Sequence, residues 1–147
     1  SMYKNVSIVD LSSNLASANS VDAVVTFRNL HNWIGPQMDT IFKNTYKALK
    51  PGGIFGIVEH RANPGTSLDV MKKSGYVTES YAIAIAEKHG FVLVDKSEIN
   101  ANPKDLKNYE RGVWTLPPSL RLKDKDKEKY LEIGESDRMT LLFKKPN

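Results

Sequence analysis

Short apolar runs alternate with amphipathic stretches over most of the chain. Ala23 to Phe27 is a nearly continuous run of β-branched and apolar residues, which is typical of a buried parallel strand. Ile54 to Glu59 predicts a second buried strand, and Phe91 to Asp95 predicts a third strong strand. Arg138 to Phe143 predicts a last strand, and Asn5 to Leu11 predicts a short strand at the start.

Helices are predicted between these strands. The first begins at Pro36, and apolar residues recur on one face up to Leu49. The run Lys50-Pro51-Gly52-Gly53 ends it, because proline cannot continue a helix and glycine accepts the left-handed turn. Further helices are predicted at residues 66–73, capped by Thr66 with Asp69, at 78–86, and near 126–133.

The alternation of strands and helices predicts an α/β fold with a mainly parallel sheet, built as a single domain over residues 1–147. Residues 101–136 form a long excursion before the last strand, which we therefore expect to enter the sheet antiparallel.

Composition narrows the classes of function. Hydrophobic residues make up 40% and charged residues 26%, as in globular domains, and no apolar run approaches the about 20 residues of a membrane helix. The chain has no cysteine, which excludes disulfides and thiolate metal sites and favours a cytoplasmic setting. The start lacks a secretory signal, and Ser1 before Met2 is interpreted as the remnant of a cleaved tag.

The net charge of +4 does not indicate nucleic-acid binding. The lysines are scattered and alternate with acids, as in Lys123 to Lys129, which reads as a solvated helical face. We therefore expect neither a nucleic-acid partner nor a membrane partner.

Three segments carry a resemblance to a known family. They are Val21-Asp22-Ala23-Val24-Val25, the Leu49-Lys50-Pro51-Gly52-Gly53 turn before a strand, and Glu87-Lys88-His89-Gly90-Phe91. In this order they resemble the C-terminal part of a class I, Rossmann-like S-adenosylmethionine-dependent methyltransferase. Thr26 to Trp33 and Val58 to Ala62 are also similar to a bacterial group of methyltransferases whose substrates are unassigned.

The resemblance implies S-adenosylmethionine as cofactor, a small-molecule methyl acceptor, and the strand order 3-2-1-4-5-7-6. It also implies that residues 5–11 are the third strand, so the first two strands of the family fold are missing from this chain. The family's Gly-x-Gly turn is absent from the sequence. We therefore expect a truncated and inactive chain, whether natural, engineered or proteolysed. We also expect a homo-oligomer formed through the sheet edge exposed at Ala23 to Phe27.

Two loops are expected to flank the site, because ligands in open α/β sheets bind beyond the carboxyl ends of the strands. The first follows Phe27. There Asn29 is a candidate for positioning the acceptor, and His31 for acting as a base or orienting group, against the simpler role of a histidine bonded to a backbone carbonyl. Trp33 is a candidate for stacking on adenine, against the simpler role of filling the space under the next helix.

The second loop holds Glu59, His60 and Arg61, all candidate catalytic residues, although Glu59 could instead form a structural pair with Arg61 or Arg28. The resemblance also implies cofactor contacts. The candidates for these are Asp10, Leu11, Arg28, Asn29 and Trp33.

No metal site is expected, because no two histidines have a ligand spacing. The segment Trp114 to Pro118 is interpreted either as a lid over the pocket or as an apolar anchor for a long loop. Two other functions stay open: a catalytically dead methyltransferase-like scaffold, and an unrelated α/β domain.

Overall fold

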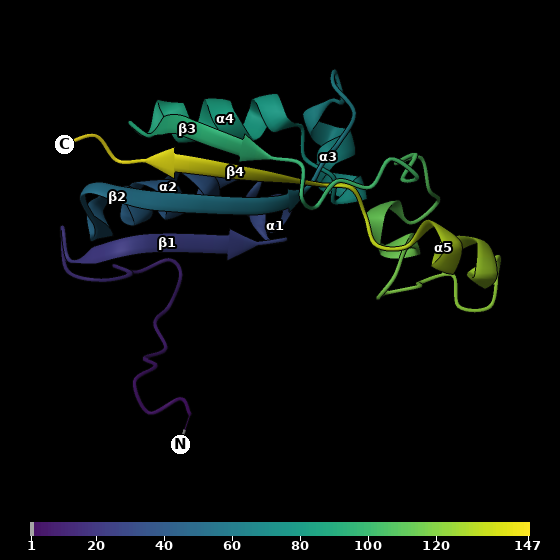
Figure 1. Ribbon diagram of the computed structural model, residues 1–147, viewed down its shortest axis with the longest axis horizontal. Coiled ribbons are helices and arrows are strands. Elements are labelled where there is room, and N and C mark those ends of the chain that lie inside the picture. Colours follow the sequence, from purple (N-terminus) through teal and green to yellow (C-terminus); the bar gives the residue numbers. More distant parts are fainter. Residues whose placement is uncertain (1) are drawn as a thin grey trace.

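The computed structural model describes residues 2–147, so the interpretation of Ser1 lies outside the described residues. Four strands form one sheet in the order β1-β2-β4-β3 (Figure 1). This is the order that the resemblance implies for the fourth, fifth, seventh and sixth strands of the family sheet. The strands are β1 (Val21–Phe27), β2 (Leu49–His60), β3 (Val92–Ser97) and β4 (Arg138–Lys144).

The sheet is mixed. β1 pairs parallel with β2, whereas β4 lies antiparallel between β2 and β3. β1, β2 and β3 therefore point the same way, which confirms a mainly parallel sheet with an antiparallel last strand. Their carboxyl ends meet at one edge of the sheet, on the right in Figure 1.

The helices start and stop where local chemistry dictates. Pro36 occupies the first turn of α2, and the hydroxyl of Thr78 caps α4 by accepting from the amide of Tyr81. α3 is capped by Ser67, not by Thr66 with Asp69 as predicted, because the Ser67 hydroxyl accepts from the amide of Val70. The elements are α1 (Leu30–Trp33), α2 (Pro36–Ala48), α3 (Leu68–Ser74), α4 (Glu79–Lys88), η1 (Gly112–Thr115) and α5 (Lys127–Ile133).

The core lies between the sheet and the helices α1, α2 and α4, which are behind the sheet in Figure 1. Phe42 of α2 packs edge-on against Phe55 of β2 at 5.4 Å between ring centroids, and Phe55 also contacts Phe91 and Phe143. Burying each such side chain stabilises the fold by roughly 1.5–3 kcal/mol. The core thus holds the carboxyl ends of β1 and β2 in fixed positions.

The other face of the sheet is uncovered among the described residues. Val25 is 58% and Phe27 63% exposed, so the expectation that residues 23–27 form a fully buried strand is wrong. β1 lies at the edge of the sheet, and helices cover only one of its faces. Its β-branched run reflects strand geometry more than burial on both sides.

The segment before β1 is not a strand. The prediction for residues 5–11 is wrong, because residues 2–20 contain neither helix nor strand and Val6 and Ile8 are exposed. A segment with alternating apolar residues gains little stability as a strand when no neighbouring strand forms hydrogen bonds with its backbone. The segment instead makes a local turn in which Asp10 accepts hydrogen bonds from the amide and hydroxyl of Ser12.

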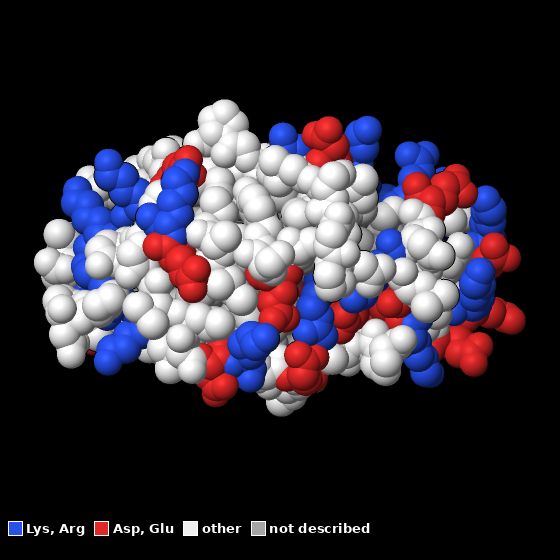
Figure 2. Space-filling model, turned by 90° about the horizontal axis from the view of Figure 1, so that it is seen from above, with Lys and Arg blue, Asp and Glu red and all other residues white. Residues whose placement is uncertain are grey.

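Charges of both signs are interspersed over much of the surface seen in Figure 2, although basic side chains predominate at its left end. Among residues 2–147, none of the helices has the length and apolar character needed to cross a bilayer.

Candidate functional site

The chain turns sharply where β1 ends. Arg28 has a φ of 53°, a left-handed conformation that is uncommon outside glycine, and its amide donates to the carbonyl of Val58 at 2.7 Å. α1 begins two residues later, which places His31 beside the carboxyl end of β2. The two loops predicted to flank the site therefore lie side by side.

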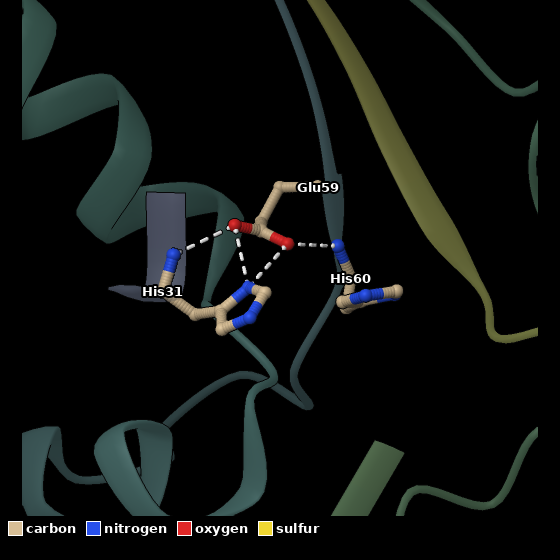
Figure 3. A group of neighbouring side chains, drawn as sticks. All are labelled: His31, Glu59 and His60. Atoms are coloured by element: carbon tan, nitrogen blue, oxygen red, sulfur yellow. Dashed lines mark hydrogen bonds and ion pairs between the residues drawn. The ribbon is translucent and has the colours of Figure 1, made fainter. Parts of the chain in front are cut away.

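Glu59 lies at the centre of this junction (Figure 3). It belongs to the helix-covered face of β2, and its side chain is fully buried, at 0% exposure. The carboxylate accepts from the backbone amides of His31 and His60, each at 2.8 Å. Its two oxygens also lie 3.0 and 3.1 Å from Nδ1 of His31.

These contacts orient the His31 ring. A carboxylate only accepts hydrogen bonds, so Nδ1 of His31 carries the proton that bonds to Glu59. In the neutral imidazole, Nε2 then keeps a free lone pair. This is the arrangement that general bases use, in which a buried acid fixes the tautomer of the histidine.

His60 lies on the other side of the Glu59 carboxylate. Its ring centroid is 5.5 Å from that of His31, and its Nδ1 is hydrogen-bonded to the hydroxyl of Ser136. Burial is the main cause that lowers the pKa of His60 to about 3, and repulsion from the neighbouring His31, Arg138 and Arg28 lowers it further. His60 is therefore a neutral imidazole at physiological pH.

A pocket of about 330 Å³ opens at this edge of the sheet. His31 and His60 line it together with residues of the loop after β1 and of the long excursion. The other lining residues are Phe27, Arg28, Asn32, Val113, Trp114, Pro117, Pro118, Ser119, Glu135 and Ser136.

The Trp114 to Pro118 segment forms one wall of this pocket. The indole of Trp114 lies 5.8 Å from the His31 ring, and the guanidinium of Arg121 lies 4.9 Å from the indole centroid on a cation–π contact. Trp114 also packs against a small apolar cluster that includes Tyr76 and Val113. The segment thus borders the pocket, as a lid would, and is fixed by apolar contacts, as an anchor of the long loop would be.

Arg61 does not reach the pocket. Its guanidinium binds both carboxylate oxygens of Asp137, at 2.9 and 3.0 Å, and also pairs with Glu98 and Glu79. The hydrogen bonds to Glu98 and Asp137 raise the pKa of Arg61. Burial opposes ionisation of Asp137, but the bonds from Arg61 and Lys107 lower its pKa to about 2. Arg61 therefore ties β2 to the start of β4.

The remaining candidates are more scattered. Asn29 precedes α1, and its side-chain oxygen Oδ1 accepts from the side-chain amide of Asn32 at 2.8 Å. Trp33 is buried in the main core, as its simpler interpretation requires, and does not line the pocket. Asp10 and Leu11 are exposed in the segment before β1, and neither lines the pocket.

Sequence reasoning missed Ser136, Glu135, Asn32 and Phe27 as pocket residues. Glu135 and Ser136 directly precede β4, which runs antiparallel, so its beginning lies at the same edge as the ends of β1 and β2. An antiparallel last strand was predicted, and its direction could have identified Glu135 and Ser136 as residues of this edge.

The structure also gathers possible metal ligands. One ligand atom from each of His31, Glu59 and His60 lies within 4.8 Å of the other two. The expectation of no metal site rested on spacing within single segments. That test misses a group assembled from two loops.

Comparisons with known proteins agree on the fold. No protein-family model matches this sequence, and no curated protein matches it significantly. Among solved structures, the [4+2]-cyclase SpnF superposes with a TM-score of 0.61 at 17% identity, over 95% of this chain and 55% of SpnF. A SAM-dependent methyltransferase from Methanosarcina mazei gives 0.59 at 15% identity, over 95% of this chain and 66% of that protein.

A third structure contains ligands. It is the 1,6-didemethyltoxoflavin-N1-methyltransferase of Burkholderia thailandensis, with bound 1,6-didemethyltoxoflavin and S-adenosylhomocysteine. It superposes with a TM-score of 0.55 at 11% identity, over 95% of this chain and 49% of that protein. This chain thus spans about half to two thirds of these proteins. It has part of the Rossmann-like fold of class I S-adenosylmethionine-dependent methyltransferases.

Proposed function

We propose that the chain is the C-terminal part of an S-adenosylmethionine-dependent methyltransferase, related to the bacterial group that it resembles, and that this enzyme acts on a small-molecule acceptor. The observation that carries this proposal is the pocket at the carboxyl ends of β1 and β2, where Glu59 orients His31 beside His60. Open α/β sheets bind their ligands at this position. The fold alone does not fix the reaction, since one structural neighbour is a cyclase.

The residues present fit one side of the cofactor. Phe27 offers an exposed aromatic ring, and Arg28 and Asn32 offer polar groups at the end of β1. No Gly-x-Gly turn follows a strand in residues 2–147, so the residues that would cradle the rest of the cofactor are not among these. When bound, S-adenosylmethionine supplies a methyl group on a sulfonium and leaves as S-adenosylhomocysteine.

The chain's own residues act on the acceptor. His31 and His60 would receive its protic group, and Nε2 of His31 would take up the proton that a protic acceptor loses. Trp114 and Pro117 form the wall that orients the acceptor and excludes water. Methyl transfer from a sulfonium depends mainly on the orientation of the acceptor. We therefore expect this chain to contribute a rigid wall and imidazole rings in fixed positions.

The test is a titration of the ¹⁵N-labelled chain with S-adenosylhomocysteine, followed by amide chemical shifts. We expect weak binding, with shifts at Phe27, Arg28, Asn32 and His60, and none around His89. Phe27→Ala should weaken binding without unfolding the chain, because Phe27 is exposed. Val70→Ala, at an exposed position of α3, is the matched control.

Shifts elsewhere, or no shifts at millimolar ligand, would contradict the proposal. The second outcome would favour the catalytically dead scaffold. The uncovered sheet face and the free edge of β1 support that alternative, and they also support our proposal that the chain self-associates there. We further propose a cytoplasmic setting, supported by the absence of cysteine.

A further inference from the structure

We propose that His31, Glu59 and His60 bind a divalent transition-metal ion at the pocket. The proposal rests on the proposed function only for the role of the ion, which is to activate the methyl acceptor. Ion binding itself follows from the arrangement of these three side chains and can be measured without any cofactor.

The first argument is geometric. Two imidazoles and one carboxylate place a ligand atom each within 4.8 Å of one another (Figure 3). The separation of 3.0 Å between Nδ1 of His31 and Oε1 of Glu59 is that of neighbouring ligands on a single ion, for metal–ligand bonds of about 2.0–2.2 Å. Binding would replace the proton now shared by these two atoms.

The second argument concerns charge. The carboxylate of Glu59 is fully buried, and His31 is its only ion-pair partner among residues 2–147, charged only when it is protonated. A buried carboxylate beside a neutral imidazole lacks a countercharge, which is costly in a medium of low polarity. A bound cation supplies that charge. Protonation of His31 is the alternative source of this positive charge.

The third argument is that the ligands already have outer contacts. The backbone amides of His31 and His60 hold one oxygen each of the Glu59 carboxylate, and Ser136 holds Nδ1 of His60. Such contacts orient ligands in known metal sites. His60 thus keeps Nε2 for the ion, and each carboxylate oxygen keeps a free lone pair.

The ligand set selects the class of metal. Imidazole nitrogen suits Zn²⁺, Fe²⁺, Co²⁺ and Ni²⁺, whereas Mg²⁺ prefers oxygen ligands. Three protein ligands leave coordination positions open toward the pocket. With the ion bound, the acceptor's oxygen or nitrogen would become a ligand and would lose its proton to solvent more readily than in water, since His31 and His60 would then hold the ion and not the proton.

The experiment uses the chain freed of metal with a chelator. Co²⁺ is added in steps at pH 7.5 while the visible absorption of the ion is recorded, and Zn²⁺ is then added as a competitor. We expect saturation at one ion per chain, displacement by Zn²⁺, and no effect of Mg²⁺. His60→Gln and His31→Gln should each weaken Co²⁺ binding at least tenfold.

The third histidine supplies the matched control. His89 caps α4 and bonds to Asp39, away from the pocket residues, so His89→Gln should bind Co²⁺ as the parent chain does. Circular dichroism and the melting temperature show whether each variant is folded. Ser136→Ala is a further variant that keeps all three ligands and removes only the contact to His60.

Three results overturn the proposal: no Co²⁺ binding up to millimolar ion, equal binding in folded His60→Gln, or a protonated His31 at pH 7.5 by NMR in the presence of ion. The titration with S-adenosylhomocysteine is run separately and without metal. A chain that binds this ligand but no ion keeps its proposed function and loses the metal site. A chain that binds the ion but not the ligand keeps the metal site and loses the methyltransferase.

Discussion

Nδ1 of His31 and Oε1 of Glu59 lie 3.0 Å apart although 28 positions separate the two residues in the chain. The first residue stands on α1 and the second near the end of β2, and the parallel pairing of β1 with β2 brings them together. This contact joins the loops that the sequence marks as functional, and two backbone amides complete it. It makes Glu59 both a structural residue and a residue of the site.

Glu59→Gln should lower the free energy of unfolding by about 1–3 kcal/mol. Glutamine keeps the shape, but it has only one acceptor oxygen for the two backbone amides that Glu59 now satisfies. Urea unfolding measures the loss. Glu87→Gln, at an exposed position of α4, should leave stability within about 0.5 kcal/mol, and equal losses in both variants would refute this role of Glu59.

His60 should stay neutral at every pH from 8 down to 5 in the metal-free chain. Burial lowers its pKa from 6.5 to about 3, so its imidazole proton signals in an NMR titration should not move over that range. Below pH 6.5 the unfolded chain binds a proton at this position that the folded chain refuses. His60 therefore reduces stability as the pH falls from 6.5 toward 3, and His60→Gln should flatten that part of the stability profile. A midpoint near 6.5 for His60 would contradict its burial.

Val25→Lys should weaken the self-association that we propose for this chain. Val25 lies on the uncovered face of β1, at the edge of the sheet, and a charge there opposes contact with a second apolar sheet face. Light scattering over a range of concentrations measures the effect. Val70→Lys on the exposed side of α3 is the control. A parent chain that is strictly monomeric at high concentration would remove the basis of this prediction.

Gly112→Ala should destabilise the chain more than Gly65→Ala. Both glycines have positive φ values, of 57° and 82°, so both substitutions carry backbone strain of about 1–2 kcal/mol. A Cβ at Gly112 would also lie 2.3 Å from the carbonyl oxygen of Ser74, whereas a Cβ at Gly65 meets no atom within 4 Å. The overlap should cost a further 1–3 kcal/mol or so, measured by urea unfolding.

Because Gly112 begins η1, which carries Trp114, the same substitution should also disturb the pocket wall. The emission of Trp114 near His31 should change in Gly112→Ala and not in Gly65→Ala. Equal stability of the two variants would contradict this prediction, because it would mean that η1 can move away from α3 without loss of stability.

Much of the fold was predictable because local signals were strong. α2 ends at Ala48, just before the predicted stop, although residues 50–53 of that stop belong to β2 and do not form a separate turn. Thr78 caps α4, and the apolar runs mark β1, β2 and β3 in the right order. The strand predicted at residues 5–11 failed because strand formation depends on a partner, and a single apolar alternation does not supply one. The exposed face of β1 was missed for the same reason, since burial depends on what packs against a strand.

For the site, the sequence by itself determined which residue types stand at the strand ends: His31 after β1, and Glu59 with His60 at the end of β2. Only the tertiary structure decided their roles. It sent Arg61 toward Asp137, buried Trp33 in the core, and joined His31 to Glu59 and His60 to Ser136. The physical reason is that strand order and pairing direction bring distant segments to one sheet edge, and side-chain chemistry depends on the neighbours found there.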